Sequence, residues 1–285
     1  MSSIINSLAF PVPPRAWSAA VLRRRADLIM LRTASGETTA AVHIRNARRA
    51  SSPTTLTILY SHANAEDLAL ALPYADVLSR FCGCDVLAYE YCGYSISSGE
   101  ASEAGCIQCV DAALAYLLEG CRLAPERIVV YGRSIGSGPT VDVASRHARL
   151  GGMVLQSAIA SAGLVVLPEM FARSLAGYDV FLNYEKIPRV RCRTLMIHGR
   201  DDRMVPFDHA LMLYPHLLDP HPPLWVDGAG HHDMPDELCL NAVASFVVFI
   251  EQRAMEKLGL RVQEPPEKPQ AARSSSWLSL FSRRS

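Results

Sequence analysis

The sequence predicts an α/β fold: a mostly parallel, twisted sheet with helices on both faces and an antiparallel edge at its N-terminal side. Two β-rich runs stand next to one another near the start, at 27–31 and 39–44, and from residue 56 onward short β-rich runs alternate with helical stretches. The chain has 285 residues, 49% of them hydrophobic, which is enough to build one large domain around a buried sheet.

The elements follow one another in a regular order. We expect eight strands, at 27–31, 39–44, 56–60, 85–91, 128–131, 153–155, 194–197 and 223–226. We expect helices at 68–81, 103–119, 137–147, 207–217 and 236–258. The two adjacent runs predict an antiparallel edge, and the alternation predicts parallel strands with crossover helices. Such sheets carry their chemistry in the loops at the carboxyl ends of the strands.

Composition divides the chain into three parts. Residues 1–25 combine Pro11, Pro13 and Pro14 with a basic triplet and predict an irregular arm. Residues 26–258 hold the predicted domain. Residues 259–285 are rich in proline and then in serine and arginine, which predicts a disordered tail. An apolar patch at 277–281 beside two arginines leaves a weak contact with a membrane or a partner as the alternative.

Charge and cysteine content exclude several classes of protein. Lys plus Arg equals Asp plus Glu, at 28 each, so no overall field attracts nucleic acid, and we expect no nucleic-acid partner. Uninterrupted apolar runs are far shorter than the roughly 20 residues of a membrane span. Cys106 and Cys109 lack a second ligand pair, so we expect no metal and no cofactor. The absence of a secretory leader predicts reduced thiols and a cytoplasmic location; nothing indicates an oligomeric state.

A candidate nucleophile lies in the stretch Gly132-Arg133-Ser134-Ile135-Gly136, a G-x-S-x-G motif between a β-branched strand pattern and a helical pattern. That context is typical of a nucleophile elbow, a sharp turn that presents the Ser134 hydroxyl at the end of a buried strand. A larger residue at Gly132 or Gly136 would clash with neighbouring backbone. The amide of Ile135 and the helix dipole would stabilise an oxyanion. A helix-capping serine on a plain turn is the alternative.

A serine hydroxyl needs a base within reach and a carboxylate that orients the base. Two later loops supply both kinds of side chain. The run 194–197 leads into Asp201 and Asp202, and the run 223–226 leads into His231 and His232. Both loops leave the carboxyl ends of predicted strands, but strand geometry does not choose within either pair.

The loop after the run 56–60 is Ser61-His62-Ala63-Asn64-Ala65. It resembles the H-G-x element of many α/β-hydrolases, in which the amide after the glycine points into the site. By that resemblance Asn64 is the candidate for the second oxyanion amide, with Ala63 as the alternative. The structural alternative is a plain turn in which Asn64 caps the following helix.

Longer stretches resemble one family, the protein depalmitoylases known as α/β-hydrolase domain-containing protein 17, from about residue 8 to residue 250. The stretches that carry the resemblance are 8–10 with the prolines after it, 61–68, 89–94, 97–99, 131–136, 139–146 and 223–231. The Asn-Ala-Glu-Asp-Leu loop and the Pro-Leu-Trp-Val run are more discriminating than the elbow. They favour this family over lipases and epoxide hydrolases.

The resemblance implies an α/β-hydrolase fold and assigns Ser134 as nucleophile, Asp202 as acid and His231 as base. It implies a thioester between a fatty acyl chain and a protein cysteine as the substrate. Family members typically begin with a palmitoylated cysteine cluster that anchors them to membrane, whereas the first cysteine here is Cys82; peripheral membrane contact stays an open alternative. Ala63 stands where the family usually has Gly, which narrows the space beside the oxyanion without removing an amide.

The apolar segment 157–188 is too short for a separate cap domain, so we expect no large cap. We expect it to form a small helical wall for an acyl chain, with plain core packing as the alternative. The expected wall residues are Leu164, Leu167, Met170 and Phe171. The sequence thus predicts a serine hydrolase acting on an acylated protein or a small acyl ester. A carboxylesterase or serine peptidase, and a non-catalytic binding module on a hydrolase scaffold, are the alternatives.

Overall fold

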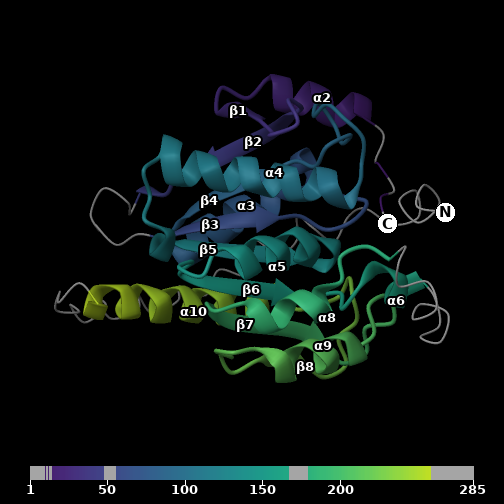
Figure 1. Ribbon diagram of the computed structural model, residues 1–285, viewed down its shortest axis with the longest axis vertical. Helices are drawn as coiled ribbons and strands as arrows, with labels where there is room; N and C mark the ends of the chain where they lie inside the picture. The colour runs from purple at the N-terminus through teal and green to yellow at the C-terminus, as the bar shows by residue number, and fades with distance from the viewer. Residues whose placement is uncertain (1–9, 11, 13–14, 48–55, 167–178, 258–285) are drawn as a thin grey trace, which may run out of the picture.

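An eight-stranded sheet forms the centre of the molecule (Figure 1). The computed structural model describes residues 10, 12, 15–47, 56–166 and 179–257. The strand order is β1-β2-β4-β3-β5-β6-β7-β8; β2 is antiparallel to both β1 and β4, and every other neighbouring pair is parallel. This arrangement confirms the predicted α/β fold with an antiparallel edge.

Each predicted strand overlaps one observed strand. The strands are β1 (Leu28–Arg32), β2 (Thr38–Ile44), β3 (Thr57–Ser61), β4 (Asp85–Tyr89), β5 (Ile128–Arg133), β6 (Gly152–Gln156), β7 (Arg193–Gly199) and β8 (Leu224–Val226). The parallel register pairs Gly132 with Leu155 of β6, and Leu155 with Met196 of β7. The carboxyl ends of these strands therefore lie along one edge of the sheet, and the loops that leave them share that edge.

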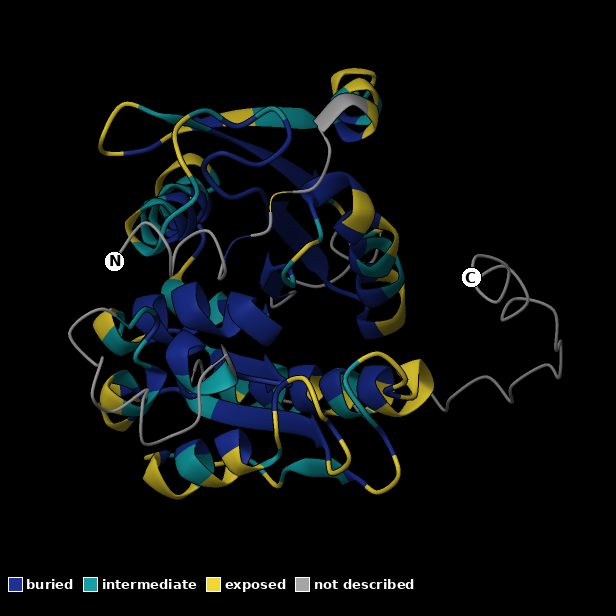
Figure 2. Cartoon of the chain, turned by 90° about the vertical axis from the view of Figure 1, so that its right-hand side faces the viewer, coloured by how far each residue is buried: buried dark blue, intermediate teal, exposed yellow. Residues whose placement is uncertain are grey.

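Alternating side chains of each strand enter two separate apolar layers. Leu59 of β3 packs in one layer, whereas Ile58 and Tyr60 pack in the other. The first layer is covered by α4 (Glu103–Ala115), α5 (Ser137–Arg146), α6 (Ala162–Val166), α8 (Asn183–Lys186) and α9 (Asp208–Leu213). The second is covered by α2 (Arg15–Arg23), α3 (Leu68–Cys82) and α10 (Asp236–Lys257). Figure 2 shows the inner strands buried between the helices, with exposed residues on the outer helix faces and loops.

The start and end of α3 are fixed by local sequence. The Asp67 carboxylate accepts a hydrogen bond from the Leu70 amide (3.1 Å), which satisfies one free donor of the first turn. Gly83 ends the helix in the left-handed conformation (φ 67°), where a side chain would be strained. Because α3 begins directly after the loop at 61–67, this cap also fixes where that loop ends.

The prediction of an irregular arm over residues 1–25 is wrong for Arg15–Arg23, which form helix α2. The prolines at 13 and 14 immediately precede this helix, and proline is favoured at a helix start, so they indicate a beginning rather than a loop. Leu22 is fully buried in the apolar layer that α3 also covers. The helix is therefore part of the folded unit. The predicted tail at 259–285 lies outside the described residues.

Two predicted helices change from α-helical to another helical form before their predicted ends. The helix expected over 103–119 is α-helical to Ala115 and continues as a π-helical turn, Tyr116–Gly120. The helix expected over 207–217 divides into α9 and a 3-10 turn, Tyr214–His216. Pro215 lies in that turn, and proline has no N–H to donate to an α-helical carbonyl.

Helix α10 is long and apolar enough to cross a membrane, because an 18-residue window within residues 236–256 has a mean hydropathy of 1.4. Uninterrupted apolar runs within it are short, which is why it does not stand out in the sequence. Its Val243, Phe246 and Ile250 side chains are buried, at the spacing of one helix face, in the layer that covers the sheet. This packing identifies α10 as a core helix of the domain.

Candidate active site

The elbow around Ser134 has the strained geometry that its sequence predicts. Strand β5 ends at Arg133, a 3-10 turn spans Ser134–Gly136, and α5 follows. Ser134 has a φ of 53°, in the left-handed region that non-glycine residues rarely adopt. Strain of this kind persists only where the surroundings enforce it, and it concentrates at functional sites.

Close backbone contacts enforce the turn. A Cβ at Gly132 would lie 2.5 Å from the Gly136 carbonyl oxygen. A Cβ at Gly136 would lie 2.3 Å from the Ser61 carbonyl oxygen and 2.6 Å from that of His62. The predicted clash at both glycines is therefore confirmed, and Gly136 brings the elbow directly against the loop that follows β3.

Asp202 and His231 meet at the carboxyl ends of β7 and β8. His231 Nδ1 donates to Asp202 Oδ2 at 2.7 Å. Asp202 Oδ1 accepts from the Met204 amide (2.9 Å) and the Val205 amide (2.8 Å). The carboxylate is thus held by its own loop on one oxygen and presents the other to the imidazole, which fixes the ring's orientation and tautomer.

The environment keeps Asp202 ionised. Burial of the carboxyl opposes ionisation, but hydrogen bonds from His231 and the Val205 amide outweigh it, so the pKa of Asp202 lies below its ordinary value. The neighbouring Asp201 and His232 are exposed. Geometry therefore pairs Asp202 with His231, the two residues that the family resemblance selects.

Ser134 is not joined to this pair by a hydrogen bond. Its side chain is largely buried, with 6% of the residue exposed, and its hydroxyl bonds to no residue in the described part of the chain. Strands β5 and β7 flank β6 and run parallel, so the loops bearing Ser134 and Asp202 leave the same edge of the sheet. Catalytic hydrogen bonds are often long in unliganded enzymes and tighten with substrate.

The candidate oxyanion donors differ in what they already bond. The Ala63 amide donates to the Glu66 carboxylate (3.1 Å). Among the described residues, none accepts a hydrogen bond from the amides of Asn64 or Ile135. The Asn64 side chain accepts from the Ala65 amide (3.0 Å) rather than capping α3, a role that Asp67 fills. Of the three candidate amides, those of Asn64 and Ile135 are therefore the ones available to donate to an oxyanion.

A buried ion pair that was not among the predicted site residues lies behind the same loop. His62 Nε2 lies 3.0 Å from Glu90 Oε1, and both side chains are at most 1% exposed. The sequence holds one indication of this pair: Glu90 directly follows the buried strand β4, and a buried carboxylate requires a hydrogen-bonding or charged partner. His198 is also buried, donates to the Val205 carbonyl (2.9 Å) and lies behind Asp202.

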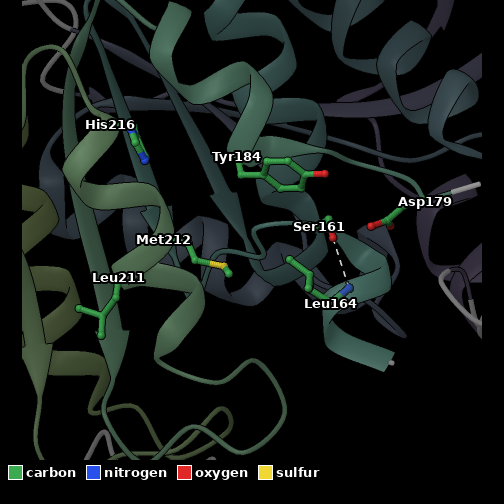
Figure 3. A pocket seen from close by; sticks show the side chains of 7 residues that line it. All are labelled: Ser161, Leu164, Asp179, Tyr184, Leu211, Met212 and His216. Atoms are coloured by element: carbon green, nitrogen blue, oxygen red, sulfur yellow. Dashed lines mark hydrogen bonds between the residues drawn. The ribbon is translucent and has the colours of Figure 1, made fainter. Parts of the chain in front are cut away.

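Two hollows adjoin this edge of the sheet. One, of about 500 Å³, lies between α6, α8 and α9 and is lined by Ser161, Leu164, Asp179, Tyr184, Leu211, Met212 and His216 (Figure 3). Leu164 and Met212 point toward one another across it. The other, of about 720 Å³, is lined by His231, His232, Arg203 and Met204 among others. Neither is lined by Ser134.

Of the four expected wall residues, Leu164 lines the 500 Å³ hollow, and Leu167, Met170 and Phe171 lie outside the described residues. The segment that carries Leu164 contacts the start of α5, because the Ile159 amide donates to Ser137 Oγ (3.1 Å). In the part of the chain that the structure describes, no group of three His, Cys, Asp or Glu side chains gathers in a way that could hold a metal ion.

Several solved structures share this fold, among them an esterase and an α/β hydrolase. An esterase from Pyrococcus furiosus aligns with a TM-score of 0.63 at 18% identity, covering 85% of this chain and 98% of the esterase. The α/β hydrolase GrgF from a Penicillium species aligns with a TM-score of 0.62 at 15% identity, covering 79% and 98%. With the strand order and the elbow, these likenesses show that the chain has the α/β-hydrolase fold.

Relatives in sequence narrow this class to one family. The α/β hydrolase domain-containing protein 17B of Xenopus tropicalis is 34% identical over 208 residues, 73% of this chain and 70% of the relative. The human 17B protein is 33% identical over the same shares, and the aho-3 protein of Caenorhabditis elegans is 37% identical over 73% of this chain and 60% of the relative. No model of a known protein family matches the chain. The chain belongs to the α/β hydrolase domain-containing protein 17 family.

Proposed function

We propose that this protein is a serine hydrolase that cleaves acyl thioesters or esters, with Ser134 as nucleophile, His231 as general base and Asp202 as the residue that orients the base. The observation that carries the proposal is the Asp202–His231 hydrogen bond of 2.7 Å at the sheet edge where the strained elbow presents Ser134. An imidazole held through Nδ1 by an ionised carboxylate leaves Nε2 free to take a proton.

The reaction then follows in two steps, acylation of Ser134 and hydrolysis of the acyl-enzyme. Ser134 Oγ attacks the acyl carbonyl carbon, its proton passes to His231 Nε2, and the carbonyl electron pair forms an oxyanion held by the amides of Asn64 and Ile135. Collapse expels the thiolate or alkoxide, which takes the proton from His231. Water then attacks the acyl-Ser134 ester, gives its proton to His231, and releases the fatty acid with the serine hydroxyl restored.

We propose a long-chain acyl thioester on a protein cysteine as the substrate. The family resemblance is the first support. The second is the 500 Å³ hollow, because Leu164, Leu211 and Met212 give it an apolar lining and its volume falls within the usual range of ligand sites. We place the acyl chain there and the leaving-group protein over the hollow that His231 lines.

A fluorophosphonate probe tests the chemistry, and an acyl panel tests the substrate. We expect the wild-type protein to be labelled, Ser134→Ala to remain unlabelled, and a palmitoyl thioester to compete better than acetyl esters. A folded wild-type protein that is not labelled would support a non-catalytic module instead. Labelling with highest activity on acetyl esters would support a carboxylesterase, and cleavage of peptides alone would support a peptidase.

A further inference from the structure

Glu90 and His62 form a buried pair whose hydrogen bonds account for every polar atom of both side chains. His62 Nδ1 lies 3.0 Å from the Ala63 carbonyl oxygen, and Nε2 lies 3.0 Å from Glu90 Oε1. Glu90 Oε1 also accepts from the Tyr91 amide (3.0 Å), and Oε2 accepts from the Leu68 amide (2.8 Å). The pair therefore joins three segments: the loop after β3, the first turn of α3 and the end of β4.

The donors and acceptors indicate the charge state of the pair. A carbonyl oxygen only accepts, so His62 Nδ1 carries a hydrogen. Both oxygens of Glu90 accept hydrogen bonds from backbone amides, so Oε1 faces His62 as an acceptor and Nε2 carries a hydrogen as well. Burial lowers the pKa of His62, but Glu90, Glu66 and the Ala63 carbonyl raise it above its ordinary value. The Tyr91 and Tyr94 rings complete its surroundings. These contacts favour an imidazolium–carboxylate pair.

The backbone of His62 also contacts the elbow. A Cβ at Gly136 would lie 2.6 Å from the His62 carbonyl oxygen, so the two backbones meet with no room between them. The same carbonyl accepts a hydrogen bond from the Tyr91 hydroxyl (2.7 Å). Asn64 follows two residues later in this loop. The position of its amide relative to Ser134 therefore depends on how His62 is held.

We propose that Glu90 is a positioning residue that acts through His62 to hold the Asn64 amide opposite Ser134, so that it determines the rate of acyl transfer rather than the binding of substrate. The inference rests on the proposed function. Glutamine at position 90 keeps the shape but has only one acceptor oxygen. Its amide group would then face either the Leu68 N–H or the Tyr91 N–H, donor against donor, because a backbone amide cannot give up its hydrogen as an imidazole can. This would loosen the contact between the loop, α3 and the end of β4.

Strand β4 offers a matched control at its other end. Asp85 is also buried, accepts from the Asn46 amide (2.8 Å) and lies 3.7 Å from His43 Nε2. Asp85→Asn thus removes a carboxylate beside a buried histidine at the opposite end of the strand from the site. A purely structural role predicts that Glu90→Gln and Asp85→Asn affect kcat alike.

The experiment measures kcat and KM on one acyl ester for the full chain and both variants, corrected for the folded fraction. We expect Glu90→Gln to lower kcat by about 10- to 100-fold, the cost of a misplaced donor, with KM within about threefold. We expect Asp85→Asn to keep kcat within about threefold of wild type. An equal loss in both variants, or a normal kcat in Glu90→Gln, overturns the proposal.

A milder pair of variants decides the matter if Glu90→Gln does not fold. Tyr91→Phe removes only the hydroxyl that bonds the His62 carbonyl, and we expect kcat to fall by about threefold to tenfold with KM unchanged. Tyr74→Phe removes a hydroxyl bonded to Tyr131 (3.0 Å), and we expect no change in kcat. Equal kcat in these two variants overturns the proposal. A wild-type protein with no hydrolase activity overturns the proposed function, and this inference with it.

Discussion

Replacing Asp202 by asparagine tests the role of the acid with little change in shape. The asparagine oxygen keeps the two hydrogen bonds from the Met204 and Val205 amides, at 2.9 and 2.8 Å. Its NH2 group then faces His231 Nδ1, where the carboxylate oxygen lay at 2.7 Å. Nδ1 must now accept, so the remaining hydrogen moves to Nε2, which can no longer take the proton of Ser134. We expect kcat to fall by about 1,000- to 10,000-fold with the fold retained.

The assay is steady-state hydrolysis of an acyl ester, with the melting temperature of each variant measured alongside. Asp201→Asn is the matched control, because Asp201 is adjacent but exposed, and we expect its kcat to stay within about threefold of wild type. More than a tenth of wild-type kcat in Asp202→Asn would refute the tautomer argument. Equal losses in the two variants would refute the choice of Asp202.

Two further predictions concern stability. In Gly136→Ala the new Cβ would lie 2.3 Å from the Ser61 carbonyl oxygen, so we expect denaturant unfolding to show a free energy of unfolding lower by about 1–3 kcal/mol. Gly120→Ala is the control, because its nearest new contact is a Tyr116 side-chain carbon at 3.2 Å and it should change that free energy little. Equal effects of the two substitutions would contradict the close approach at Gly136. Burial is the main cause that lowers the pKa of His209 to about 4, with a smaller effect of the neighbouring His198, so the folded state resists a proton that the unfolded state binds below about 6.5. Stability should therefore fall by up to about 3 kcal/mol as pH drops from 6.5 to 4, and His209→Gln should flatten this slope; an unchanged slope would contradict the assignment.

The strands were predictable because a buried parallel strand is a short, continuous apolar run. All five residues of β3 are buried, and the run 56–60 stands out for that reason. Helix α2 was not predictable by the same signal. Its prolines are typical of loops as well as of helix starts, and only tertiary packing of Leu22 distinguishes the two.

The sequence pattern predicted which loops carry the candidate site, but it did not choose between neighbouring side chains within a loop. Asp201 and Asp202 follow the same strand, and they differ because the Met204 and Val205 amides turn back onto Asp202 alone. That turn depends on backbone angles that the residue pattern does not determine. The Glu90–His62 pair joins residues 28 positions apart, so its contact is a property of the β3–β4 pairing and not of either segment.

Trapping the acyl-enzyme tests directly whether Ser134 is the nucleophile. The wild-type protein is mixed with a palmitoyl thioester, quenched in acid during turnover, digested and mapped by mass spectrometry. We expect a palmitoyl group on the peptide that contains Ser134, and no such group in Ser134→Ala. Steady hydrolysis of the thioester with no acyl group on Ser134, or with the acyl group on another residue, would contradict it.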